Sequence, residues 1–197
     1  MTNRVRTMLL FFVDYLLCIV YQILGLILLS WALDFSWAMP VYSTLFTIVL
    51  FSQMYRRGKK AAGRDLRNHE KKPLFFDGVL MVLPLVLFQL AVILGYVWLK
   101  ASPLGSSVVQ VIYSFPDNLP RVAKEITLAE SLVPYLRIWF GSVMGFMGRG
   151  FLVPVALMVP LSHLLAGSLG YLAGLKRVYI LDIIIGIWRA IWDRFYD

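Results

Sequence analysis

The sequence predicts an all-α protein, a polytopic integral membrane helical bundle with about four transmembrane helices and additional interfacial or re-entrant helices. The chain of 197 residues is 60% hydrophobic, and its mean hydropathy is +0.76, whereas a soluble domain is roughly 45–50% apolar. Long apolar stretches alternate with basic ones, and eight of the 19 Lys and Arg residues lie within residues 55–72. A water-soluble fold could not cover this much apolar surface, so we expect residues 1–197 to form a single membrane domain.

The first half of the chain predicts a helical hairpin followed by a basic loop. Residues 8–33 are long enough for a tilted helix, because crossing the hydrocarbon core takes about 20 residues. This run exceeds the apolar core of a signal peptide, roughly 7–15 residues, so we expect a retained helix. Residues 38–54 are expected to cross the membrane back to the side on which the chain begins. Residues 55–72 then form a loop that the positive-inside rule assigns to the cytoplasm.

The second half predicts two further crossings, at residues 74–99 and 151–175. Between them, residues 101–134 form an extracytoplasmic loop. It acts either as a cap over the bundle or as a solvated connector, and it includes an amphipathic helix over residues 121–132.

Two shorter apolar segments are not expected to cross. Residues 135–148 are too short and predict an interfacial or re-entrant helix. Residues 178–195 carry two Trp residues among charged ones and predict a helix along the cytoplasmic face.

The distribution of charge orients this arrangement. Fourteen of the Lys and Arg residues fall on the cytoplasmic side and five on the outer side, the bias that membrane insertion favours. We therefore expect a multi-pass protein of the plasma or inner membrane with both termini in the cytoplasm.

The pattern Tyr-x-x-Gly-x-Lys occurs twice, starting at Tyr55 and at Tyr171, and an Asp follows each copy at Asp65 and Asp182. Each copy indicates an interfacial Tyr, a Gly that ends or kinks a helix, and a cation at headgroup depth. The repetition is explained either by two duplicated hairpins or by the residues that any cytoplasmic helix end tends to use.

Asp14 is an ionisable residue inside the first apolar run, where an unpaired charge costs several kcal/mol. It is interpreted either as a proton or cation site or as the partner of a loop cation such as Lys71 or Lys72. The ion-pair interpretation is favoured.

Three further polar residues lie deep in apolar runs: Gln22, Gln89 and His163. Together with Asp14 they form the candidate intramembrane polar site. The competing interpretation, favoured for all three, is hydrogen bonding between neighbouring helices.

Two other groups complete the candidate residues. Small residues at intervals of four predict close helix packing: Gly141, Gly145, Ala166, Gly170 and Gly174. Basic residues of the loop are expected to face anionic lipid headgroups or a protein partner: Arg56, Arg57, Lys59, Lys60, Arg64, Arg67, Lys71 and Lys72.

No sequence motif indicates an enzyme, a metal site or a cofactor. The single cysteine, Cys18, lies in an apolar run and lacks the neighbours of a zinc site or a thiol catalyst. No hydrolase, kinase or nucleotide-binding motif is present in the sequence. Basic residues are not interleaved with aromatic ones, so we expect no nucleic acid partner.

Two functions remain open. The first is a non-catalytic scaffold or accessory subunit of a membrane complex, which binds a protein partner or forms a homo-oligomer. The alternative is a small-solute transporter, or the substrate-binding component of one, because Pro84, Pro154 and Pro160 interrupt helices where substrate sites often form.

Overall fold

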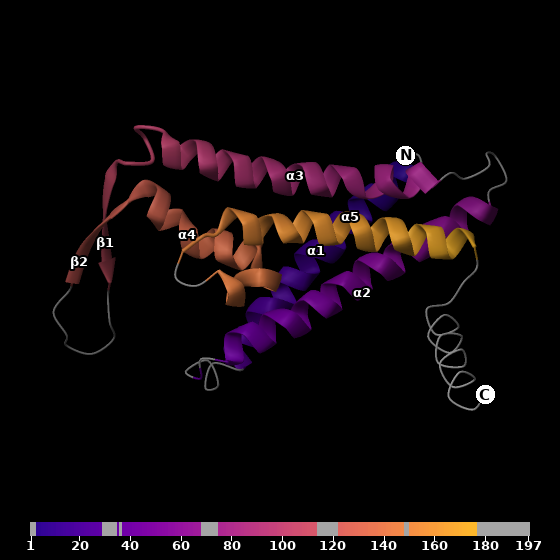
Figure 1. Ribbon diagram of the computed structural model, residues 1–197, viewed down its shortest axis with the longest axis horizontal. Coiled ribbons are helices and arrows are strands. Elements are labelled where there is room, and N and C mark those ends of the chain that lie inside the picture. Colours follow the sequence, from indigo (N-terminus) through magenta and orange to yellow (C-terminus); the bar gives the residue numbers. More distant parts are fainter. Residues whose placement is uncertain are drawn as a thin grey trace, which may run out of the picture. The chain divides into compact units, whose positions relative to one another are not determined.

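The computed structural model describes residues 3–28, 35, 37–67, 75–113, 122–147 and 150–176. Within them the chain is almost entirely helical (Figure 1), and the predicted all-α membrane helical bundle is confirmed. The predicted helix 178–195 and the cations Lys71 and Lys72 lie outside the described residues. The elements are α1 (Asn3–Leu28), α2 (Ala38–Arg67), α3 (Phe75–Ala101), β1 (Val108–Tyr113), β2 (Val122–Thr127), α4 (Leu128–Trp139), the 3-10 helix η2 (Gly141–Phe146) and α5 (Val153–Leu175).

Three of these helices are long and apolar enough to cross a membrane: Arg4–Leu28 in α1, Phe76–Ala101 in α3 and Val153–Leu175 in α5. Many of their large apolar side chains point outward, such as Leu28 at 75% and Leu94 at 66% exposure. Apolar surface of this extent is rarely exposed to water but is suited to lipid. The chain is therefore a multi-pass membrane protein.

Helix α2 corrects the prediction of a basic loop at residues 55–72, because the helix continues as far as Arg67. The basic segment is rich in Arg, Lys and Ala, which have high helix propensity, and charge alone does not end a helix. The first half of α2 contains Ser43 and Thr47, and α2 is not among the three helices that are long and apolar enough to cross a membrane. The fourth crossing, residues 38–54, stays a prediction.

The chain divides into two compact units, and the long helices pass through both. Unit 1 comprises Met1–Leu16, Ile48–Val86 and Leu161–Asp197, and unit 2 comprises Leu17–Thr47 and Leu87–Pro160.

In unit 1, α3 and α1 both run antiparallel to α5. Gly78 lies against Tyr171, and Val82, one turn later in α3, lies against Gly167, one turn earlier in α5. Helix α1 follows the same order of contacts, which are Phe11 with Gly167 and Tyr15 with His163.

Helix α2 instead runs parallel to α5 in unit 1. Tyr55 lies against Gly170, and Ala62 lies against Gly174, so residue numbers rise together along both helices. Helices α1 and α3 thus point one way and α2 and α5 the other. Successive crossings must alternate in this manner, so the direction of α2 is the one that a fourth crossing requires.

In unit 2, the predicted loop at residues 101–134 contains a two-stranded antiparallel sheet (Figure 1). The register pairs Val108 with Thr127 and Tyr113 with Val122. The first half of the predicted helix 121–132 is therefore wrong. Its β-branched residues favour a strand when a partner strand lies alongside, and that partner could not be seen from the segment itself.

Helix α4 begins after this sheet with a capping box, in which the Thr127 hydroxyl accepts from the Glu130 backbone N–H and the Glu130 carboxylate accepts from the Thr127 N–H. A single helix over residues 135–148 is not formed. The chain leaves α4 at Trp139 and continues as η2, which is buried over its first four residues.

Candidate functional site

Asp14 of α1 is bound by Arg57 of α2 in unit 1. Arg57 donates through Nε and Nη2 to the two carboxylate oxygens, a bidentate arrangement that is among the stronger polar contacts. The Asp14 side chain is 14% exposed and that of Arg57 22%. The partner is therefore a cation of the basic segment, although the sequence had suggested Lys71 or Lys72 rather than Arg57.

Two further polar contacts join the helices of unit 1. Arg4 Nη2 lies 2.9 Å from Asp77 Oδ1, which connects α1 with α3. The Tyr171 hydroxyl donates to Asp65 Oδ2 at 2.7 Å, which connects α5 with α2. With the contact of Asp14, these bonds link all four long helices through one carboxylate each from α1, α2 and α3.

Tyr171 fills a slot between two glycines in unit 1. The side chain is fully buried within the chain, and its place at the membrane interface stays a prediction. A Cβ at Gly78 would lie 2.7 Å from Tyr171 Cβ, and a Cβ at Gly58 would lie 2.9 Å from the Tyr171 backbone nitrogen. Both positions therefore require glycine for the Tyr171 hydroxyl to reach Asp65.

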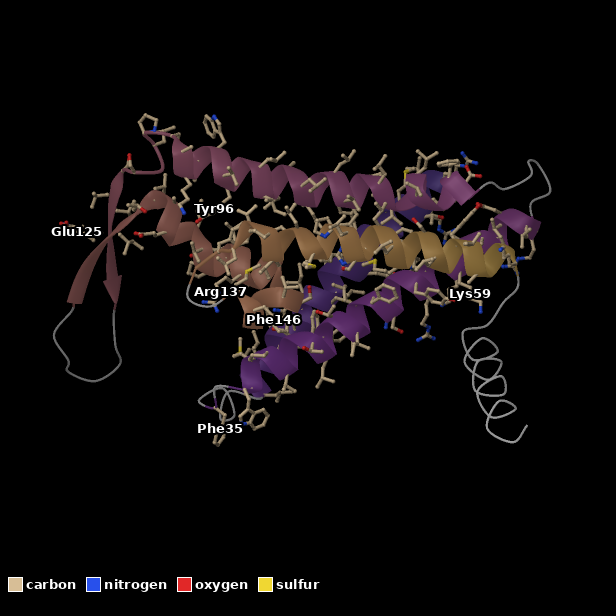
Figure 2. All side chains as sticks on the ribbon, viewed as in Figure 1. Phe35, Lys59, Tyr96, Glu125, Arg137 and Phe146 are labelled. Carbon is tan, nitrogen blue, oxygen red and sulfur yellow. The ribbon has the colours of Figure 1, made fainter. Side chains whose placement is uncertain are left out.

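The predicted small-residue ladder of α5 packs against α2 of the same chain. A Cβ at Gly170 would lie 2.1 Å from the Tyr55 carbonyl oxygen, and one at Gly174 would lie 2.8 Å from the Lys59 carbonyl oxygen. Figure 2 shows Lys59 on α2 near the end of α5. Ala166 is fully buried. The two backbones are in direct contact at Gly170 and Gly174, so a helix of another protein could not occupy these positions.

The remaining polar candidates are buried rather than open to solvent. His163 has no exposed surface and lies edge-on to Tyr15, with ring centroids 5.2 Å apart. Gln89 of α3 also has none, and Gln22 of α1 is 1% exposed.

Gln22 packs against η2 in unit 2. Its Nε2 donates to Met144 Sδ at 3.5 Å, and a Cβ at Gly141 would fall 1.5 Å from the same nitrogen. Gly145 is equally restricted, because a Cβ there would lie 2.3 Å from the Met39 carbonyl oxygen. The packing role predicted for Gly141 and Gly145 thus has its partners in α1 and α2.

Ser43 and Thr47 of α2 are site residues that sequence reasoning missed. Ser43 Oγ accepts from the Gly145 backbone N–H at 2.7 Å, and Thr47 Oγ1 donates to the Ser142 carbonyl oxygen at 2.6 Å. Backbone that leaves the α-helical pattern inside a membrane protein needs such partners. The signal in the sequence was the concentration of Ser and Thr in residues 38–54.

The six basic candidates that the structure describes all lie on α2, from Arg56 to Arg67. Among the described residues, no group of three or more His, Cys, Asp or Glu side chains is placed to hold a metal ion.

In comparisons with known proteins, no family model matches the chain, and no curated protein or solved structure is significantly similar to it. The functional argument therefore starts from the contacts described above.

Proposed function

We propose that this chain is a non-catalytic integral membrane protein that acts as a scaffold or accessory subunit of a membrane complex. The observation that supports the proposal is the use of the carboxylates in unit 1. Asp14, Asp65 and Asp77 are each bound by another helix of the same chain. Carboxylates engaged in this way stabilise an arrangement of helices, and they are not presented to a substrate.

The transport alternative has less support from the same geometry. A solute site at the membrane midplane needs polar side chains that line a wet cavity. Gln22, Gln89 and His163 have between 0% and 1% of their surface exposed, so their side chains do not line an open cavity within the described residues. We therefore retain the scaffold or accessory role as the proposed function.

Helix α1 provides the most extensive surface for a partner helix. Only 22% of its apolar stretch is buried, against 39% in α3 and 44% in α5. Exposed apolar residues recur along α1 at intervals of three and four, the spacing of helix-packing faces: Leu9, Val13, Leu16, Val20, Leu24 and Ile27. The partner is either another protein or a second copy of this chain.

In this proposal the protein resides in the plasma or inner membrane with both termini in the cytoplasm. The positions of the cations and the shared direction of α2 and α5 support this orientation. The basic part of α2 then contacts anionic lipid headgroups.

Site-specific photo-crosslinking in the native membrane tests the subunit role. A photoreactive residue at Val20 of α1 should give one discrete protein adduct, and the same residue at Leu94 of α3 serves as the control on a lipid-facing surface. Both positions are more than half exposed. The proposal fails if the chain leaves the membrane in mild detergent as a lone monomer and Val20 yields lipid adducts only.

A further inference from the structure

Four cations of α2 form one continuous face, which we call the basic strip: Arg56, Lys60, Arg64 and Arg67. Their spacing of four, four and three residues places them within an arc of about 80° around the helix axis, at about 100° per residue. Arg56, Lys60 and Arg67 are exposed, and Arg64 is partly exposed.

The opposite face of this part of α2 is packed within the chain. Gly58, Ala61 and Ala62 are buried, with Gly58 against the backbone of α5. Asp65, the carboxylate of this segment, lies on the packed side and accepts from Tyr171. The basic strip is therefore held on a fixed helix, and its neighbouring carboxylate is already engaged on the other side.

The cations of the strip are not neutralised by the residues that the structure describes. Arg57, which is not part of the strip, is bound to Asp14. Within the described ranges, no strip residue forms an ion pair, while Arg64 and Arg67 donate only to backbone carbonyl oxygens one turn earlier in α2.

The strip lies at the level where the apolar part of α5 ends. Gly174 is beside Lys59 and Ala62, and the apolar helix α5 ends one residue later at Leu175. At about 1.5 Å per residue, the strip extends roughly 5 Å before Lys59 and roughly 8 Å past Ala62. Long Lys and Arg side chains reach headgroups from this depth.

We propose that the basic strip binds the phosphate groups of anionic phospholipids in the cytoplasmic leaflet. The planar fork of Arg binds phosphate oxygens in pairs, and three of the four residues are Arg. The inference rests on the proposed orientation and deepens the lipid contact stated above by assigning it to four residues. It does not require a protein partner.

Lipid retention by the full-length protein tests this site. The protein in neutral detergent is titrated with phosphatidylglycerol or phosphatidylcholine of equal chain length, and bound lipids are counted by native mass spectrometry. The test variant replaces all four strip residues by Gln (Arg56→Gln, Lys60→Gln, Arg64→Gln and Arg67→Gln). A matched pair of single variants compares Lys60→Gln with Lys100→Gln, an exposed cation at the far end of α3.

We expect the fourfold variant to lose at least tenfold in affinity for phosphatidylglycerol and to keep its affinity for phosphatidylcholine. Each cation near a membrane surface contributes a factor of about five, and neighbouring cations bind one phosphate together, so Lys60→Gln should lose more affinity than Lys100→Gln, which lies outside the strip. A charge-retaining variant, with Arg56→Lys, Arg64→Lys and Arg67→Lys, should keep most of the preference. An unchanged melting temperature without added lipid shows that the variants fold.

The proposal is overturned if the wild type does not prefer phosphatidylglycerol, or if the fourfold variant keeps that preference. Failure of the subunit role leaves the lipid measurement unaffected, since only purified protein and lipid are present, so the two failures are distinguishable.

Discussion

At the scale of single residues, the charged groups in apolar helices are stabilised by side chains of other helices. Asp14 lies on α1, but the cation that binds it, Arg57, is 43 positions away on α2. The sequence correctly suggested a cation of the basic segment. It could not choose among eight of them, because the choice depends on which side of α2 faces α1.

The substitution Asp14→Asn should destabilise the protein by about 1.5–3 kcal/mol, since it weakens hydrogen bonds between charged groups and leaves the partly buried Arg57 charge uncompensated. Thermal unfolding in detergent measures the loss. The double variant Asp14→Asn with Arg57→Gln should recover part of it, because no unpaired charge then remains. Equal losses in the single and double variants would show that the ion pair is not the cause.

The substitution Tyr171→Phe should cost about 1.5–3 kcal/mol in unfolding free energy, the range for hydrogen bonds to charged groups. The ring still fills the slot at Gly78, so only the bond to Asp65 is lost. Tyr21→Phe is the matched control because Tyr21 is 65% exposed. Similar melting temperatures for the two variants would contradict the assigned bond.

At the scale of elements, α2 and α5 pack with their backbones in direct contact. The variant Gly170→Ala should destabilise the protein by about 1–3 kcal/mol, since the new methyl group meets the Tyr55 carbonyl oxygen and the helices must move apart. Gly95→Ala in α3 is the control: nothing lies within 4 Å of a Cβ there, and alanine raises helix propensity. Unfolding measurements should therefore separate the two variants in opposite directions.

The 3-10 helix η2 depends on hydroxyl groups of α2. Ser43→Ala removes the acceptor of the Gly145 N–H and leaves a partly buried donor without its partner, which costs about 1–3 kcal/mol. Amide hydrogen exchange across residues 141–147 should accelerate roughly 5- to 150-fold. Thr44→Ala is the control, because Thr44 bonds only to the carbonyl of Pro40 in its own helix. Unchanged exchange in Ser43→Ala would refute the role of this hydroxyl.

Sequence reasoning located α3 and α5 within two residues and placed the start of α1 five residues too late, because apolar length is a local property. The predicted run 8–33 became a helix that starts at Asn3 and is described to Leu28. Predictions that depended on contacts between segments were less successful. The strands β1 and β2 form because each pairs with the other. The basic half of α2 packs on α5 through Gly58, and this contact supports the helix past its apolar half.

For the candidate site too, sequence reasoning found the residues that residue type alone identifies and missed those that depend on contacts between segments. Residue types identified Asp14, Gln22, Gln89 and His163 as buried polar groups, and all four are buried or nearly so. Ser43 and Thr47 were not identified as site residues. A hydroxyl in a membrane helix usually bonds within its own helix, and only the position of η2 shows that these two also bond to another element.

At the scale of the whole molecule, four long helices alternate in direction within unit 1, and charge is concentrated where α2 and α5 end. Both features agree with a bundle that crosses the membrane repeatedly. The fourth crossing, at residues 38–54, is the part of this arrangement that most needs a direct measurement.

Cysteine labelling in intact cells provides that measurement, in a Cys18→Ala background with a membrane-impermeant maleimide. Ser106→Cys, which follows α3, should react in intact cells. Arg64→Cys on α2 and Lys176→Cys after α5 should react only after the membrane is permeabilised. Labelling of Arg64→Cys from outside intact cells, or the same accessibility for Arg64→Cys and Ser106→Cys, would contradict the orientation and the crossing on which both proposals depend.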